Sequence, residues 1–163
     1  MFKKFRFFIF CLLPGLLTAC GQQGQDTVAG IDPAALRYYQ SLAAPGDWLV
    51  INYWAEWCPP CIEEIPELNR VHQQAGFSVF AVDDHLSDKQ VLDARAKKAG
   101  IDYIVLDHDP SESLGYERPG VLPATVLIHP ESAVTRYLFG AQTKASILQT
   151  IRALQESAPS ETN

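Results

Sequence analysis

Residues 52–66 read Asn-Tyr-Trp-Ala-Glu-Trp-Cys-Pro-Pro-Cys-Ile-Glu-Glu-Ile-Pro, and they join an apolar run to a helical pattern. The run that enters this stretch, 48–54, is almost wholly apolar, which predicts a strand covered on both faces. Ile62, Ile65 and Leu68 follow at helical spacing and predict a helix that continues to Gly76. Two cysteines separated by two residues indicate a redox dithiol, half of a metal site or a haem attachment point.

Strand and helix patterns alternate through most of the chain, which predicts an α/β fold with a mixed central sheet flanked by helices. Ser87 and Gln90 have the spacing of a capping box and predict the start of one of the helices, which ends at Gly100. The other predicted elements are helix 33–43, strands 77–82 and 103–106, an antiparallel hairpin of 124–128 with 134–139, and a final helix through Leu154.

The first residues belong to a separate segment. Lys3, Lys4 and Arg6 precede an apolar run at 7–17, which is too short to span a bilayer as a helix. A basic start followed by a short apolar run predicts a secretory signal peptide, here residues 1–19.

The end of this signal resembles the lipobox of bacterial lipoproteins, because Leu17-Thr18-Ala19 precedes Cys20. That resemblance implies that Cys20 is lipidated and becomes the first mature residue, and Gly21 after it favours the outer membrane. Residues 20–31 then form a flexible tether, residues 32–156 a single domain, and residues 157–163 a polar tail.

Composition narrows the function further. The chain has 163 residues, of which 47% are hydrophobic, so it suffices for one domain with a proper core. Removal of the signal leaves 10 basic and 19 acidic residues, a net charge of −9. Such a surface repels nucleic acid. We also find no phosphate-binding fingerprint and expect no cofactor.

Elimination favours the redox interpretation of the cysteine pair. Cys11 lies in the signal and Cys20 is assigned to the lipid, so Cys58 and Cys61 are the remaining thiols. Structural zinc requires four ligands, and the chain has no second cysteine pair and only scattered histidines. Haem attachment requires histidine directly after the second cysteine, where Ile62 stands. We therefore expect no metal and a reactive dithiol.

The predicted start of the helix assigns roles to the two sulfurs. Cys58 lies at the helix N-terminus, where free N–H groups favour a thiolate, so it is the expected nucleophile. Cys61 lies one turn further and resolves the mixed disulfide. Pro59 and Pro60 lack N–H groups, so we expect the N–H of Cys61 to stabilise the thiolate. The Cys58 pKa should then fall below its free value, but less than in the strongest oxidants.

At these residues the chain resembles the thioredoxin superfamily. The stretch from Trp54 to Cys61, with Pro66 after it, is similar to the active-site stretch of that superfamily, and Leu122-Pro123-Ala124-Thr125 is similar to its cis-proline turn. The resemblance covers 48–154 and implies a thioredoxin-like fold. It also implies substrate contacts, which we assign to Trp57, Pro59, Pro60, Leu122 and Pro123.

Within the superfamily, the chain resembles the TlpA-like branch. Asn52 stands where thioredoxin has a buried aspartate, Glu64 follows Cys61 as in that branch, and 87–106 resembles the central helix–strand insertion of the branch. One departure is the helix expected at 33–43, where the branch usually begins with a hairpin. We expect Glu64 to have a raised pKa and to carry the proton of Cys61.

The resemblance implies a lipid-anchored, periplasmic thiol–disulfide oxidoreductase that acts on protein disulfides. It favours a reductant supplied by a membrane electron donor, with apocytochrome c as one client. The alternatives are an oxidant that installs disulfides and a non-enzymatic lipoprotein that binds a metal or a partner.

Acidic side chains follow two of the predicted strands, at 83–84 and at 107–109. In right-handed strand–helix–strand units these positions share an edge with Cys58. They either form an acidic rim for a basic client or are ordinary solvated loop charges.

Overall fold

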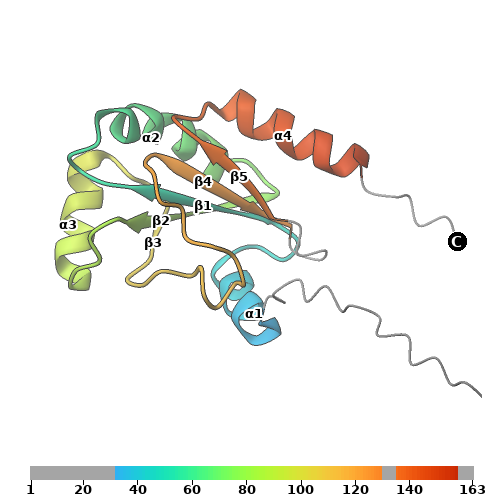
Figure 1. Cartoon of the computed structure of the whole chain (residues 1–163), viewed down its shortest axis with the longest axis horizontal. Helices are drawn as coiled ribbons and strands as arrows, with labels where there is room; N and C mark the ends of the chain where they lie inside the picture. The colour runs from blue at the N-terminus through green and yellow to red at the C-terminus, as the bar shows by residue number, and fades with distance from the viewer. Residues whose placement is uncertain (1–31, 130–134, 158–163) are drawn as a thin grey trace, which may run out of the picture.

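The computed structural model describes residues 32–129 and 135–157, and Figure 1 shows a twisted sheet with helices on both faces. The sheet has the strand order β3-β2-β1-β4-β5. The strands are β1 (Trp48–Trp54), β2 (Phe77–Asp83), β3 (Ile104–Val105), β4 (Ala124–Ile128) and β5 (Thr135–Phe139). The helices are α1 (Pro33–Leu42), α2 (Pro59–His72), α3 (Lys89–Ala99) and α4 (Lys144–Ser157).

Strand β1 forms the centre of the sheet. It pairs in parallel with β2 and antiparallel with β4, and all seven of its residues are buried. This burial confirms the strand expected from the apolar run, because only a strand covered on both faces is apolar at every position. The reactive stretch therefore leaves the central, fully buried strand of the sheet.

The two faces of the sheet carry separate cores. On one face α2 and α4 pack over Val50, Val79 and Leu127. On the other face α1 and the segment after β3 cover Leu49, Phe80 and their neighbours. In Figure 1, α1 lies on the opposite side of the sheet from α2 and α4. The predicted mixed sheet between helices is confirmed.

Most predicted elements are present, with corrections at their ends. Helix α2 ends at His72, with Gln73 as its C-cap, so the continuation to Gly76 is wrong. Gly76 instead has a φ of 91° in the turn that leads into β2. Strand β3 has 2 residues rather than the four expected. Helix α4 ends at Ser157, one residue inside the predicted tail.

The capping box predicted at Ser87 is also wrong. Asp88 is the N-cap of α3, with no side-chain capping bond, and the Ser87 hydroxyl donates to the carbonyl oxygen of His85 at 3.0 Å. The predicted stop at Gly100 is confirmed, because this glycine adopts a left-handed conformation at a φ of 81°.

The predicted helix before β1 is confirmed as α1, which starts at an Asp32 cap. Within residues 32–129 and 135–157, none of the helices is long and apolar enough to cross a membrane. The signal peptide, Cys20 and the tether lie outside the described residues.

The contact of α2 with the sheet supplies the first prediction. Leu68 is completely buried, so Leu68→Ala should lower the free energy of unfolding by about 2–5 kcal/mol, measured by denaturant titration. Leu42 on α1 is 39% exposed, and Leu42→Ala should change the free energy of unfolding by no more than about 0.5 kcal/mol. Equal losses in the two variants would contradict this account of the core.

Candidate redox site

The two cysteines lie where β1 passes into α2. After β1, a turn closes with the Cys58 N–H donating to the carbonyl oxygen of Ala55 at 3.1 Å. Cys58 is the N-cap of α2, and the next two residues are the prolines expected in the first turn. A disulfide joins Cys58 to Cys61, with their Cα atoms 5.3 Å apart.

The sulfurs differ in their access to solvent. Cys58 is 4% exposed to solvent, whereas Cys61 is completely buried. A client disulfide can therefore approach Cys58 only, which supports the roles expected from the sequence, with Cys58 attacking and Cys61 resolving.

The Cys61 N–H, which we expect to stabilise the Cys58 thiolate, bonds to the backbone in the disulfide form. This group donates to the backbone carbonyl oxygen of Cys58 at 3.0 Å, and the Ile62 N–H donates to the same oxygen at 3.2 Å. The first turn of α2 thus directs these donors to the backbone of Cys58 and away from its sulfur.

The predicted cis proline lies next to the disulfide. The Leu122–Pro123 peptide bond is cis, as expected. Tyr53 pairs with Ala124 across β1 and β4, so Pro123 stands beside the end of β1 that leads to Cys58. Leu122 packs against the core that contains both cysteines. Sequence positions 65 residues apart thus meet at one site.

A groove of about 450 Å³ lies against Trp57, the residue that precedes Cys58. Trp57 forms one side of it and the segment 118–122 forms much of the rest. The sequence predicted the Trp57 and Leu122 contributions, but Arg118 and Val121 were missed. No local pattern marks these two residues, because their role depends on the path of the loop toward Pro123.

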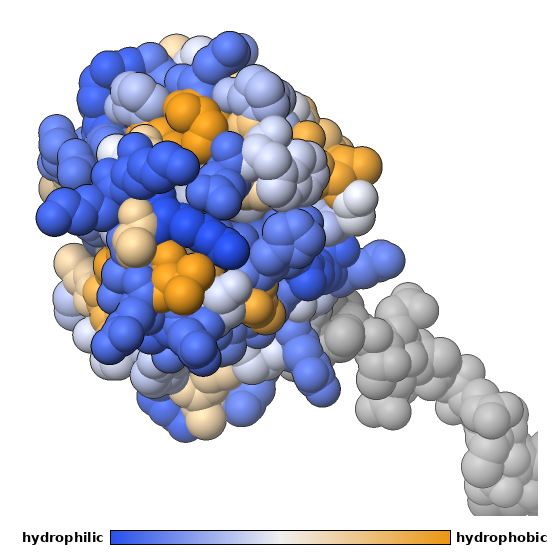
Figure 2. Space-filling view, turned by 90° about the vertical axis from the view of Figure 1, so that its left-hand side faces the viewer, coloured by the Kyte–Doolittle hydropathy of each residue, from blue (hydrophilic) through white to orange (hydrophobic). Residues whose placement is uncertain are grey.

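Three large apolar side chains remain exposed near the ends of β1 and β4. Trp57 is 59% exposed, Val121 57% and Phe139 60%. Phe139 pairs with Ala124 and so lies one strand away from Pro123. Figure 2, seen from the α3 side, shows a largely hydrophilic surface with small separate apolar patches. Trp57 and Val121 both line the groove, which gives it an apolar part.

Three of the acidic residues near the strand ends are paired with arginine side chains. Arg118 binds Asp84 at 3.2 Å and Asp109 at 3.1 Å, and Arg95 binds the buried Asp83 at 3.4 Å. The structure therefore favours neither the open acidic rim nor independent solvated charges. Instead, these aspartates and arginines join neighbouring loops.

Glu64 is the buried charged group of the site, with 2% exposure. Its Oε1 accepts from Asn52 Nδ2 at 2.8 Å and its Oε2 accepts from the Gln142 N–H at 2.7 Å. The Tyr103 hydroxyl donates to Asn52 Oδ1 at 3.1 Å and so fixes the orientation of the amide. Burial raises the pKa of Glu64 to about 7, against the lowering effect of the two N–H donors.

This pKa leads to a prediction about stability. Because folding raises the Glu64 pKa from 4.5 to about 7, the folded state loses stability as the pH rises between those values. The unfolding free energy of the oxidised wild type, minus that of Glu64→Gln, should fall by about 3 kcal/mol between pH 4 and pH 8.

The control for this prediction is Glu63→Gln, since Glu63 is the exposed neighbour of Glu64. Denaturant titrations with this variant should give a difference from wild type that stays flat over the same pH range. A flat difference for Glu64→Gln as well would contradict the buried, raised-pKa carboxyl.

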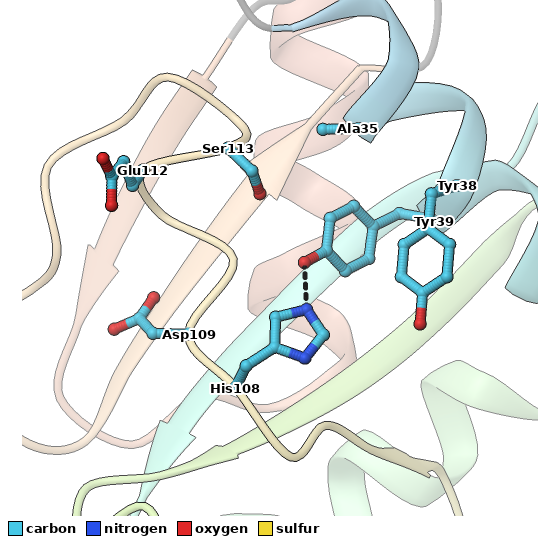
Figure 3. A pocket seen from close by; sticks show the side chains of 7 residues that line it. All are labelled: Ala35, Tyr38, Tyr39, His108, Asp109, Glu112 and Ser113. Atoms are coloured by element: carbon cyan, nitrogen blue, oxygen red, sulfur yellow. Dashed lines mark hydrogen bonds between the residues drawn. The ribbon is translucent and has the colours of Figure 1, made fainter.

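A second hollow, of about 480 Å³, lies between α1 and the segment after β3. Figure 3 shows the Tyr39 hydroxyl bonded to His108 Nε2, and their separation is 2.8 Å. The hollow includes none of the predicted site residues. Within the described part of the chain, no group of three or more His, Cys, Asp or Glu side chains is placed to hold a metal.

Taken together, the sheet order, the disulfide at the start of α2 and the adjacent cis proline define a protein of the thioredoxin-like class. Residues 35–137 match the AhpC/TSA family, and the chain belongs to that family.

Named relatives agree with this assignment. The chain is 26% identical over 113 residues to thiol-disulfide oxidoreductase ResA of Geobacillus thermodenitrificans (strain NG80-2), covering 68% of this chain and 64% of the relative. It is 30% identical over 106 residues to ResA of Bacillus subtilis (strain 168), covering 63% and 58%. The matches thus span less than two thirds of these relatives' length.

A solved structure also resembles the chain. The thiol:disulfide interchange protein of Chlorobium tepidum TLS, a thioredoxin family protein, superposes with a TM-score of 0.52 at 26% identity. The superposition covers 69% of this chain and 83% of that protein. The expected superfamily and fold are confirmed.

Proposed function

We propose that the protein is a thiol–disulfide oxidoreductase that acts on protein disulfides. The observation that carries the proposal is the Cys58–Cys61 disulfide at the N-terminus of α2, with Cys58 outermost. The names of the relatives, thiol-disulfide oxidoreductase and thiol:disulfide interchange protein, support it.

The reaction runs in two exchanges. In the reduced protein, the Cys58 thiolate attacks one sulfur of the client disulfide and releases the other client sulfur as a thiolate. Cys61 then attacks the Cys58 sulfur, releases the second client thiol and closes the Cys58–Cys61 disulfide. The client gains two electrons and two protons; the protein loses two electrons and the proton of Cys61, and solvent supplies the second proton.

The second exchange requires Cys61 to lose its proton. Glu64 lies one helical turn beyond Cys61 on α2, and its pKa is about 7. A carboxyl with this pKa both accepts and returns a proton near neutral pH. Glu64 is therefore the base in the proposed mechanism.

The client binds in the groove that lies against Trp57. Trp57, which precedes Cys58, and Leu122, which precedes the cis Pro123, both line this groove, and Pro59 and Pro60 lie between the cysteines. The exposed Val121 and Phe139 extend this apolar surface. Such a surface favours an extended client segment with apolar side chains near its cysteine.

Trapping of a mixed disulfide tests the proposed roles. Cys61→Ser should accumulate a covalent complex with a disulfide-containing client, because Cys58 still attacks and nothing resolves the product. The complex is measured by non-reducing electrophoresis and mass spectrometry, and its release by dithiothreitol is the control.

The matched variant is Cys58→Ser, which should form no such complex, because the fully buried Cys61 cannot reach a client. Trapping by Cys58→Ser in place of Cys61→Ser would reverse the roles. Failure of both variants, together with stoichiometric zinc or copper in the wild type, would instead support a metal-binding lipoprotein.

We infer that the protein works as a reductant. A strong oxidant stabilises the thiolate of its reduced form with nearby donors. Here Pro59 and Pro60 have no N–H groups, and the N–H of Cys61 donates to the Cys58 carbonyl. With few donors for its thiolate, the pair should hold its electrons less tightly than a strong oxidant does.

A glutathione redox titration measures this direction. The Cys58–Cys61 pair should have a potential of roughly −200 to −270 mV, in the range of glutaredoxins and thioredoxin. A value near about −120 mV, as in a strong oxidant, would favour the alternative that the protein installs disulfides.

The proposed location follows from the N-terminal sequence. The signal at 1–19 and the lipobox-like residues before Cys20 support a lipid anchor on the periplasmic side of the envelope, with Gly21 favouring the outer membrane. A reductant in that oxidising compartment requires a membrane electron donor. Apocytochrome c is the client that the TlpA-like resemblance suggests.

A further inference from the structure

Thr125 has a buried hydroxyl group without a partner. The residue lies on β4 with no exposed surface, and within the described residues its Oγ1 makes no hydrogen bond. Buried hydroxyl groups are normally bonded, so an isolated one points to a partner in another state of the protein. Trp54 Nε1 is the other such side-chain atom in the described part of the chain, and it can only donate.

The position of Thr125 connects it to Glu64. Asn52 and Thr125 are directly paired across β1 and β4, so their side chains share one face of the sheet. The Glu64 carboxyl joins Asn52 on β1 to the N–H of Gln142 beyond β5. Strand β4 lies between β1 and β5. Thr125 on β4 therefore lies between the two groups that the Glu64 carboxyl binds, on the face of the sheet that carries Asn52.

The hydrogen bonds of Glu64 suit its ionised form only. Both carboxyl oxygens accept, one from Asn52 Nδ2 and one from the Gln142 N–H. A protonated carboxyl carries an O–H donor and needs an acceptor. The Gln142 N–H cannot accept, and the Asn52 amide presents its Nδ2 donor to Glu64 while its Oδ1 accepts from the Tyr103 hydroxyl. Of the two unpartnered buried atoms, Thr125 Oγ1 alone can take this role.

We propose that Thr125 Oγ1 accepts the hydrogen bond of protonated Glu64, which makes Thr125 a positioning residue for the carboxyl that serves Cys61. The inference rests on the proposed function for its catalytic consequence. In that step the proton of the Cys61 thiol moves to Glu64, and the Glu64 O–H then donates to Thr125 Oγ1. The Cys61 thiolate attacks the Cys58 sulfur, the bond from Cys58 to the client sulfur breaks, and the client leaves as a thiolate. No electrons pass through Thr125.

This bond acts against the donors on the other side of the carboxyl. The N–H groups of Asn52 and Gln142 stabilise the charged form of Glu64 and lower its pKa, whereas an acceptor stabilises the neutral form and raises it. Thr125 thus helps to place the protonation of Glu64 near neutral pH.

Other titratable groups surround the carboxyl. Cys61 and Glu67 lie on α2, where Glu67 accepts from the backbone N–H of Lys144 at 3.0 Å. Tyr103 lies behind Asn52, and the ring of His72 is 6.4 Å from the Tyr103 ring. Because the pH dependence of activity could reflect any of these groups, the test must follow the protonation of the Glu64 carboxyl itself.

The test compares Thr125→Val with Thr125→Ser in the oxidised, full-length protein. Glutamate carboxyl groups labelled with ¹³C are titrated by NMR, and Glu64→Gln assigns the Glu64 signal. Thr125→Val should lower the Glu64 midpoint by about one pH unit, because the neutral form loses its acceptor. Thr125→Ser keeps the hydroxyl and should hold the midpoint near the wild-type value.

The direction of the shift separates the proposal from a structural effect. Replacing a polar group by a methyl makes the surroundings more apolar, which alone would raise the Glu64 pKa. A raised or unchanged midpoint in Thr125→Val overturns the proposal. Thr125→Ala removes the hydroxyl with a smaller side chain and gives the same reading if Thr125→Val does not fold.

A second measurement separates this inference from the proposed function. The pH dependence of client reduction should move with the Glu64 midpoint in Thr125→Val. A shifted NMR midpoint with an unshifted rate profile supports the Thr125 bond and contradicts the catalytic role of Glu64. An unshifted midpoint with a rate profile that Glu64→Gln abolishes contradicts Thr125 alone.

Discussion

Every residue of β1 is buried, and the strand is hydrogen-bonded on both sides, to β2 and to β4. This double pairing holds the end of β1 in place, and the turn to Cys58 begins there. It also aligns Ala124 with Tyr53, which brings the cis proline beside the disulfide. A slip of one residue would turn the side chains of β1 to the opposite face and move Asn52 away from Glu64.

The site combines two opposing electrostatic effects on one carboxyl. Burial disfavours the charge on Glu64, and the N–H donors of Asn52 and Gln142 favour it. The donors come from a strand at the centre of the sheet and from the backbone beyond its edge. Burial has the larger effect, so the carboxyl titrates near neutral pH instead of remaining charged.

Local patterns predicted the fold and the reactive pair well. The cysteine spacing and the proline-rich first turn lie within one short stretch, and the cis bond at Leu122–Pro123 was predicted from the resemblance to the thioredoxin superfamily. The contact of Gln142 with Glu64 and the groove side chains Arg118 and Val121 were not predictable, because they depend on how remote loops pass one another. The capping box at Ser87 was wrong because the Ser87 hydroxyl donates to the carbonyl oxygen of His85 and α3 begins one residue later, after Asp88.

Arg118 joins the loops that line the groove next to Trp57. Its guanidinium group binds Asp84 after β2 and Asp109 after β3, and it lies 5.9 Å from the centre of the Tyr53 ring. Arg118 itself belongs to the loop that carries the cis proline. Arg118 thus links three loops from different parts of the chain. A groove that is already shaped before binding loses little conformational entropy when a client enters, so the ordering required for recognition falls mainly on the client.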